Sequence, residues 1–285
     1  MLELHNRSAV PEFKVFSLLR SATLTVRDTQ CQGTCRSMSA EECTTTTQLI
    51  FPYRGVYVRH VGQDQTVAEA NQVLFFNANE GYQVSHPLAG GHGSLTLVIE
   101  QSLEELAPAD LLRRRRSGIA FCRQNLRIDA PAQALVALLR HRLQQRVAEC
   151  LEAEALALTL VRRTFGPRGF DVPSPTFGRQ KLVDRAKIVL SSDLMRRWTL
   201  AEIAGELHVS PVYLTQVFQR VEGLLLYQYQ LRLRLARALD LLARYDDLTT
   251  LALDLGFSSH SHFSAAFRRH YGYSPSAFKR TAQRR

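Results

Sequence analysis

The sequence lacks the long hydrophobic runs and the dense cysteine pattern that define several classes of protein. Its uninterrupted aliphatic runs are only a few residues long, whereas a membrane helix needs about 18 or more. Residues 1–7 contain no apolar stretch, so no secretory signal is visible, and we expect a cytoplasmic protein with no membrane partner. Five cysteines, an odd number in a long chain, favour reduced thiols or metal ligands over a disulfide framework.

Motifs of the common enzyme classes are missing as well. The sequence contains no glycine-rich phosphate loop, no nucleophile elbow and no pair of carboxylates at catalytic spacing. We therefore expect that the chain is not an enzyme.

What the chain does have is an excess of positive charge, and this excess is uneven. Its formal net charge is +10. Residues 1–180 carry 20 Lys and Arg against 17 Asp and Glu, whereas residues 181–285 carry 16 against 9. A basic domain beside a nearly neutral one favours a polyanionic partner for the basic part. A cationic surface kept for solubility is the alternative, and charge alone does not separate the two.

The pattern along the chain predicts two domains joined by a linker. Short alternating or fully apolar segments separated by turn residues, over about residues 20–100, are typical of a small barrel or sandwich. The period becomes helical after residue 101, with two antiparallel helices from Pro131 to Phe165. Glycines and prolines over 166–180 predict the linker, and residues 181–285 are helical to the end.

Two segments of the C-terminal domain share the layout helix, tight turn, helix. In the first, Thr199 with Glu202 forms a capping box, and Ser210 caps a second helix that begins at Pro211. In the second, Thr249 opens a helix, Gly256 makes the turn, and Ser258 or Ser259 caps the following helix. This is the geometry of a helix-turn-helix, whose second helix enters the major groove of DNA.

The second segment closely resembles the C-terminal signature of the AraC/XylS family of bacterial transcription regulators. The resemblance rests on Asp254-Leu255-Gly256-Phe257-Ser258-Ser259-His260-Ser261-His262-Phe263-Ser264 and on Phe267-Arg268-Arg269-His270-Tyr271-Gly272-Tyr273-Ser274-Pro275, and it covers about residues 182–281. It implies an α+β protein with an N-terminal cupin-like β-barrel and helix pair over 1–165. The all-α domain at 181–285 would then carry two helix-turn-helix motifs and bind promoter DNA.

The resemblance also implies which side chains meet DNA. Val212, Thr215 and Gln216 would face bases from the first recognition helix, and His260, Ser261 and Ala265 from the second. Many relatives have arginine where Ala265 stands and proline where Leu225 stands, so the second helix has lost a base reader. Lys279 and Arg280 are further phosphate candidates. The full set of DNA-binding candidates is Val212, Tyr213, Thr215, Gln216, Gln219, Arg220, Ser259, His260, Ser261, His262, Ser264, Arg268 and Arg269.

Three cysteines in the N-terminal half have spacing that is compatible with a metal site. Cys31, Cys35 and Cys43 could supply most of a tetrahedral zinc site, with His86 or His92 as the fourth ligand. Three reduced structural thiols, or a redox-sensing thiol, are the alternatives. The four-cysteine zinc domain of some DNA-repair regulators is not expected, because its later Cys-x2-Cys is missing.

The resulting hypothesis is a DNA-binding transcription regulator whose N-terminal domain senses a small molecule, a metal or a redox signal. We expect a homodimer, with RNA polymerase as a partner if the protein activates transcription.

One alternative is a cupin-type metalloenzyme fused to a DNA-binding domain. The strand region argues against it, because its histidines are isolated in sequence and the single His-x-His pair lies in a recognition helix. Another is a constitutive DNA-binding protein whose barrel only dimerises.

Overall fold

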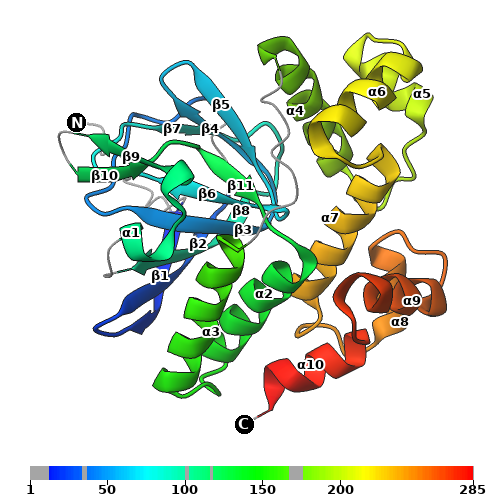
Figure 1. The fold of residues 1–285 in the computed structure, drawn as a ribbon. Helices are drawn as coiled ribbons and strands as arrows, with labels where there is room; N and C mark the ends of the chain where they lie inside the picture. Colours follow the sequence, from blue (N-terminus) through cyan, green and yellow to red (C-terminus); the bar gives the residue numbers. More distant parts are fainter. Residues whose placement is uncertain (1–12, 34–36, 100–102, 116–117, 167–175, 285) are drawn as a thin grey trace, which may run out of the picture.

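The structure of the chain is a computed structural model, which describes residues 13–33, 37–99, 103–115, 118–166 and 176–284. Strands make up most of the first half and helices make up the second, with the two halves in contact (Figure 1). This arrangement confirms the expected α+β class. None of the described helices is both long enough and apolar enough to cross a lipid bilayer.

A six-stranded antiparallel sheet forms the centre of the N-terminal domain. Val26 lies opposite Leu97, and Leu97 in turn lies opposite Leu49 on the next strand. Leu49 also lies opposite Phe75, so one continuous row of side chains, each at most 1% exposed, crosses the sheet. The strands in their order across the sheet are β1 (Phe13–Arg20), β2 (Leu24–Cys31), β8 (His92–Ile99), β3 (Gln48–Arg54), β6 (Gln72–Phe76) and β11 (Asn125–Arg127).

A second sheet covers the opposite face of the first. Because side chains alternate along a strand, Ile50, Leu74 and Phe76 point away from the row above and pack against this second sheet. Its strands are β5 (Asp64–Ala68), β4 (Tyr57–Val61) and β7 (Gln83–Ser85). The described strands of the two sheets do not pair into a closed barrel; they form a sandwich instead. Alternation identifies strands, but it does not say which edges pair.

A short hairpin explains the run of arginines near residue 113. The hairpin consists of β9 (Leu112–Arg115) and β10 (Gly118–Phe121). Arg115 lies 2.6 Å from a carboxylate oxygen of Glu80, and Arg113 lies 3.8 Å from the same oxygen. Burial acts to raise the pKa of Glu80, but its hydrogen bonds and the nearby arginines lower it overall. At least two arginines of the run therefore neutralise a buried carboxylate within this domain.

Two helices cover the free face of the large sheet, as the helical period predicts. Helix α2 (Ala130–Gln144) begins after Asp129, whose carboxylate accepts a hydrogen bond of 2.9 Å from the amide of Ala132. Helix α3 (Cys150–Thr164) returns beside it. Both helices contribute to the same apolar core as the buried row of the sheet. The short α1 (Leu103–Leu106) and the 3₁₀ turn η1 (Ala109–Leu111) precede them in the chain.

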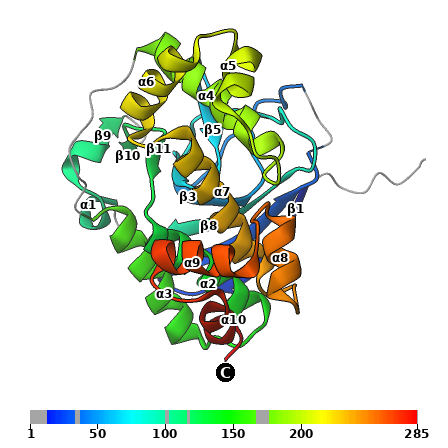
Figure 2. The ribbon, with the colours of Figure 1, turned by 90° about the vertical axis from the view of Figure 1, so that its right-hand side faces the viewer.

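The C-terminal domain consists of two three-helix units joined by one long helix, α7 (Leu226–Leu241) (Figure 2). Tyr229 and Leu233 of α7 belong to the core of the first unit, whereas Leu235 and Leu239 belong to the core of the second. Helix α4 begins at Phe177, inside the range 166–180 expected for the linker. The first unit is α4 (Phe177–Ser192), α5 (Leu200–Leu207) and α6 (Pro211–Glu222), and the second is α8 (Leu248–Asp254), α9 (His260–Tyr271) and α10 (Pro275–Gln283).

The two domains are joined by a buried ion pair. Arg140 of α2 and Asp240 of α7 lie 2.5 Å apart, and each side chain is only 1% exposed. The guanidinium of Arg140 also stacks on the ring of Tyr53, 3.9 Å from its centroid. Next to this pair, Nε2 of His141 lies 2.8 Å from the carbonyl oxygen of Leu239. Burial lowers the pKa of His141 to about 4, so the ring is neutral near pH 7 and donates this hydrogen bond.

A second polar contact joins the first unit to the strands. Lys187 of α4 lies 2.8 Å from Glu222 of α6, and both side chains are almost fully buried. Arg127 of β11 reaches the same carboxylate at 3.1 Å and donates 2.6 Å to the Glu222 carbonyl oxygen. Burial alone would lower the pKa of Lys187, but Glu222 and Glu69 raise it overall, so the lysine stays charged. The N-terminal domain thus holds both helical units by charged contacts.

Candidate nucleic-acid interface

The first helix-turn-helix is built by the caps that the sequence predicts. The Thr199 hydroxyl accepts 3.2 Å from the amide of Glu202, and the Glu202 carboxylate accepts 2.7 Å from the amide of Thr199. Helix α5 ends at His208, which adopts the left-handed conformation with φ 56°. Ser210 then caps α6 by accepting 3.2 Å from the amide of Tyr213. A three-residue turn therefore separates the two helices.

The second helix-turn-helix follows the same plan with one correction. The N-cap of α8 is Asp247, which accepts from the amides of Thr249 at 3.0 Å and Thr250 at 2.8 Å, so Thr249 does not open the helix. In the turn, Gly256 has φ +76°, and a Cβ atom there would lie 2.5 Å from the carbonyl oxygen of Met195. Ser259, and not Ser258, caps α9, accepting 3.1 Å from the amide of His262.

Helix α6 presents the expected readers on its outer face. Leu214, Val217 and Phe218 are buried in the unit's core, and this fixes which side of the helix faces solvent. Val212 is 66% exposed and Gln216 is also exposed. Thr215 is half-buried and donates its hydroxyl hydrogen to the carbonyl oxygen of Pro211 at 3.0 Å, which leaves its methyl group and its lone pairs for a base. Tyr213, Gln219 and Arg220 are exposed as well.

The exposed face of helix α9 carries small and basic side chains. His260, Ser261, Ala265, Arg268 and Arg269 are exposed, whereas Phe263 and Phe267 are buried beneath them. These exposed residues carry one imidazole and one hydroxyl near the start of the helix and two guanidinium groups near its end.

Two histidine side chains of α9 make hydrogen bonds within the protein. The imidazole of His260 lies 3.2 Å from the Ser264 hydroxyl, and Ser264 itself is half-buried. The ring of His262 lies 3.1 Å from the Ser258 hydroxyl and edge-on to Phe257. His262 thus supports the turn, and the first turn of the helix is held in shape by these pairs.

Other basic residues of the domain are engaged within the protein. Arg234 of α7 donates to the carbonyl oxygens of Leu194 at 2.6 Å and Gly256 at 3.3 Å, so it ties the first unit to the turn of the second. Lys279 donates 2.6 Å to the carbonyl oxygen of Tyr245, which reduces its value as a phosphate contact, whereas Arg280 is exposed.

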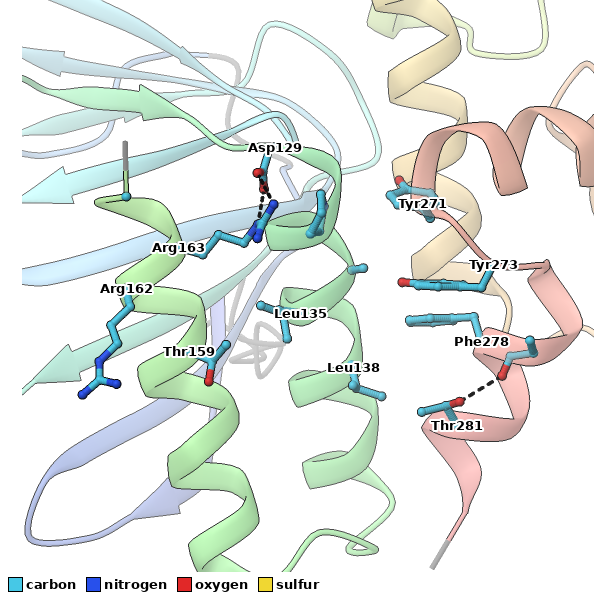
Figure 3. Close-up of a pocket in the computed structure, with 14 residues that line it drawn as sticks. Asp129, Leu135, Leu138, Thr159, Arg162, Arg163, Tyr271, Tyr273, Phe278 and Thr281 are labelled. Carbon is cyan, nitrogen blue, oxygen red and sulfur yellow. Dashed lines mark hydrogen bonds and ion pairs between the residues drawn. The ribbon is translucent and has the colours of Figure 1, made fainter. Parts of the chain in front are cut away.

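An open groove lies where the helix pair meets the second unit. Its volume is about 820 Å³. Leu138 of α2 faces Tyr273 and Phe278 across it, as Figure 3 shows, and Leu135 also lines it. Arg163 lies at the groove, but its guanidinium is paired with Asp129 at 2.7 Å. The groove is therefore mostly apolar, and the exposed Arg162 is a second cation among its lining residues.

The N-terminal domain brings together three potential metal ligands that are far apart in sequence. They are Cys31, His86 and His92, all buried. The histidines that are isolated in the sequence thus lie side by side in the fold. Of the expected cysteine set, only Cys31 belongs to this group: Cys43 is exposed and outside it, and Cys35 lies outside the described residues.

Comparison with known proteins points to the C-terminal domain. A helix-turn-helix domain family, HTH_18, matches residues 203–281. The HTH-type transcriptional regulator GadX of Escherichia coli O6:H1 is 32% identical over 162 residues, which are 54% of this chain and 57% of that protein. The HTH-type transcriptional activator RhaR of Klebsiella pneumoniae is 29% identical over 54% of this chain and 56% of that protein. The chain spans somewhat over half the length of these relatives.

Solved structures match the chain only with low TM-scores. A transcriptional regulator with an AraC-type DNA-binding domain from Chromobacterium violaceum is 29% identical, covering 38% of this chain and 98% of that one, with a TM-score of 0.36. ToxT from Vibrio cholerae is 12% identical, covering 96% of this chain and 99% of that one, also with a TM-score of 0.36. Over its C-terminal helix-turn-helix region, the chain is thus similar in sequence to known transcription regulators.

Proposed function

We propose that the chain is a sequence-specific DNA-binding regulator of transcription whose N-terminal domain senses a signal. The observation that carries the DNA-binding part is the pair of capped helices α6 and α9. Each buries an apolar face in its own core and leaves polar and basic residues outside. The domain that presents them also holds most of the chain's net positive charge, because residues 181–285 carry 16 Lys and Arg against 9 Asp and Glu.

The sensing part is supported by a partly open cavity between the two sheets of the N-terminal domain. Its volume is about 440 Å³, which is of the size that small-molecule sites have. Aromatic and polar side chains line it, among them Tyr57, Tyr82, Ser94 and Thr96. A cavity of this kind favours a sensing role over the alternative of a barrel that only dimerises.

Salt dependence of binding tests the DNA-binding function. The full chain, selected against a randomised operator library, should enrich one motif. If it contacts about six phosphates, the logarithm of its affinity should fall against the logarithm of salt concentration with a slope near −5. Fluorescence anisotropy with the selected duplex, from low to physiological salt, measures the slope. Failure to enrich any motif, or binding that salt does not weaken, would rule the proposal out.

The proposed homodimer uses the outer face of α3. Helix α2 packs against the sheet, against α3 and against the C-terminal units, so its surface is largely used. On α3, Leu151 is 76% exposed and Ala155 is exposed beside it. These neighbours form an apolar strip that a second copy would cover. If the regulator activates transcription, we propose RNA polymerase as a further partner. We also propose that the protein is cytoplasmic.

A charge placed on this strip tests the dimer. Leu151→Arg should weaken self-association at least about tenfold, because an unpaired charge would be buried at the interface. Sedimentation velocity over a range of protein concentrations measures it, with Arg162→Glu, at the other end of the helix, as the matched control. A wild-type chain that stays monomeric at every concentration would contradict the proposal.

A further inference from the structure

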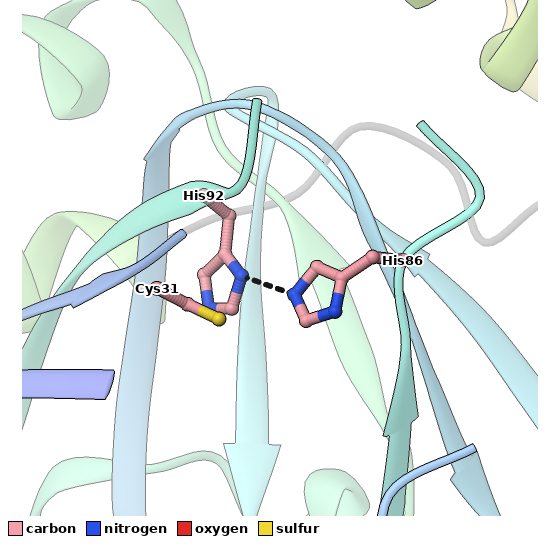
Figure 4. Close-up of side chains that lie close together, drawn as sticks. All are labelled: Cys31, His86 and His92. Atoms are coloured by element: carbon pink, nitrogen blue, oxygen red, sulfur yellow. Dashed lines mark hydrogen bonds between the residues drawn. The ribbon is translucent and has the colours of Figure 1, made fainter. Parts of the chain in front are cut away.

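The three grouped ligands in the N-terminal domain meet at one end of the sandwich. Cys31 is the last residue of β2, His92 is the first residue of β8, and His86 follows β7 directly. One ligand atom from each lies within 4.8 Å of the others, and each residue is only 6% exposed. Figure 4 shows the thiol of Cys31 beside the ring of His92, with the ring of His86 approaching from the other strand.

The fold itself brings these residues together. In the ladder between β2 and β8, Cys31 lies directly opposite His92. The chain enters β8 through Gly91, which has φ +66°, and a Cβ atom there would lie 2.0 Å from the carbonyl oxygen of Cys31. The amide of Gly33 lies 3.4 Å from the Cys31 sulfur and donates to it, a contact that stabilises a thiolate. The arrangement therefore depends on register and on glycine, not on a sequence motif.

The chemistry of the group suits a cation that prefers nitrogen and sulfur. Nε2 of His86 and Nδ1 of His92 lie 2.9 Å apart, so a lone pair of one ring faces the other ring. Nδ1 of His86 is buried and makes no hydrogen bond within the described protein, which is unusual for a buried polar atom. Imidazole nitrogen and thiolate sulfur are ligand atoms that Zn²⁺ takes up.

We propose that Cys31, His86 and His92 bind one Zn²⁺ ion. Zinc–sulfur and zinc–nitrogen bonds of about 2.3 and 2.0–2.1 Å place ligand atoms roughly 3.3–3.7 Å apart on a tetrahedron. The observed separations, 2.9 Å between the two ring nitrogens and 4.8 Å or less within the group, therefore need only small movements of the three side chains. Three protein ligands leave the fourth position open, as in zinc sites that take up water or a solute.

The open position faces the cavity between the sheets. Cys31, His86 and His92 line this cavity together with Tyr57, Tyr82 and further polar groups. A small solute with a thiolate or carboxylate group could therefore bind the metal while its body occupies the cavity. This part deepens the proposed sensing role and rests on it, whereas metal binding stands independently of DNA binding.

The first experiment measures zinc on the full chain. Protein is stripped with a chelator under reducing conditions and titrated with Zn²⁺ against a chromogenic competitor. One equivalent should bind per chain. Cys31→Ser, His86→Gln and His92→Gln should each weaken binding by more than about 100-fold, since even neighbours of metal ligands are worth 10–100-fold. Cys43→Ser and His60→Gln are the matched controls, because they lie in the same domain outside the group and should bind as the wild type does.

The second experiment keeps the proposal testable if a variant folds poorly. Wild-type protein loaded with Co²⁺ should show a thiolate-to-cobalt charge-transfer band, and Zn²⁺ should remove that band. Thermal unfolding should show that Zn²⁺ raises the midpoint of the wild type and leaves that of His92→Gln unchanged. Absence of bound zinc, or a site lost in Cys43→Ser and kept in Cys31→Ser, would overturn the assignment. DNA binding, measured in parallel on metal-free protein, separates this result from the proposed regulatory function.

Discussion

Replacing Asp240 by asparagine should lower the free energy of unfolding by about 3–5 kcal/mol, the cost of removing one partner from a buried ion pair. Asp240 accepts from Arg140 of the N-terminal domain and from Arg237 of its own helix, and it is 1% exposed. Without its negative charge, two guanidinium groups stay partly or fully buried with no counter-charge. Urea unfolding, followed by the fluorescence of Trp198, the single tryptophan, measures the loss.

An exposed ion pair provides the control for this prediction. Arg114 and Glu104 lie 3.7 Å apart, but their side chains are 90% and 53% exposed. Arg114→Gln should therefore change the unfolding free energy by no more than about 1 kcal/mol. Equal effects of the two substitutions would mean that burial of the Arg140–Asp240 pair does not matter.

Gln216→Ala should cost about 1–3 kcal/mol of binding free energy on the cognate site and relax the preference at one or two base pairs. The amide of Gln216 offers a donor and an acceptor on the exposed face of α6, a pair that matches adenine. Ser261→Ala should cost much less, because a hydroxyl bonds with several bases and Ala265 beside it can at most touch a thymine methyl group. The first recognition helix should therefore supply most of the hydrogen-bonded sequence information.

Arg268→Ala should act in a different way. We expect it to weaken binding to cognate and random DNA alike and to reduce the salt slope by about one unit, as the loss of a phosphate contact does. Selection of a randomised operator library with the three variants decides between the roles. A selected motif that is unchanged by Gln216→Ala and partly erased by Ser261→Ala would reverse the assignment of the dominant helix. His260, which could read guanine, is the residue to test next in that case.

The helices and their caps could be predicted because a cap is a local chemical signal. Thr199, Ser210 and Ser259 each place an oxygen at fixed spacing before an apolar period, and the structure uses all three. Asp247 was missed because Thr249, two residues later, offers a similar oxygen. In the sandwich, alternation indicated several strands before residue 100, but it missed β9, β10 and β11, which lie in the range 101–165 expected to be helical. It also did not indicate the pairing, which depends on which edges meet in space.

The proposed zinc ligands and the contacts between the domains could not be predicted from the sequence, for related reasons. Cys31 meets His92 through the register of β2 and β8, and register has no local signature. Arg140 lies among leucines on α2, and a long charged side chain on a helix usually faces water. Its burial is visible only once Asp240 of another domain is placed beside it.

The attachment of both helical units to one N-terminal body has a consequence for the shape of the operator. The first unit is held by Arg127 of β11, which pairs with Glu222, and the second packs against Ala134 and Ala137 of α2. With both ends of α7 anchored, the two reading helices cannot adjust their separation independently. For the proposed DNA binding, we expect the two subsites to lie on one face of the duplex, spaced by whole helical turns of about 10–10.5 base pairs. Any signal that loosens the anchors would therefore change which spacings the protein tolerates before it changes which bases the protein prefers.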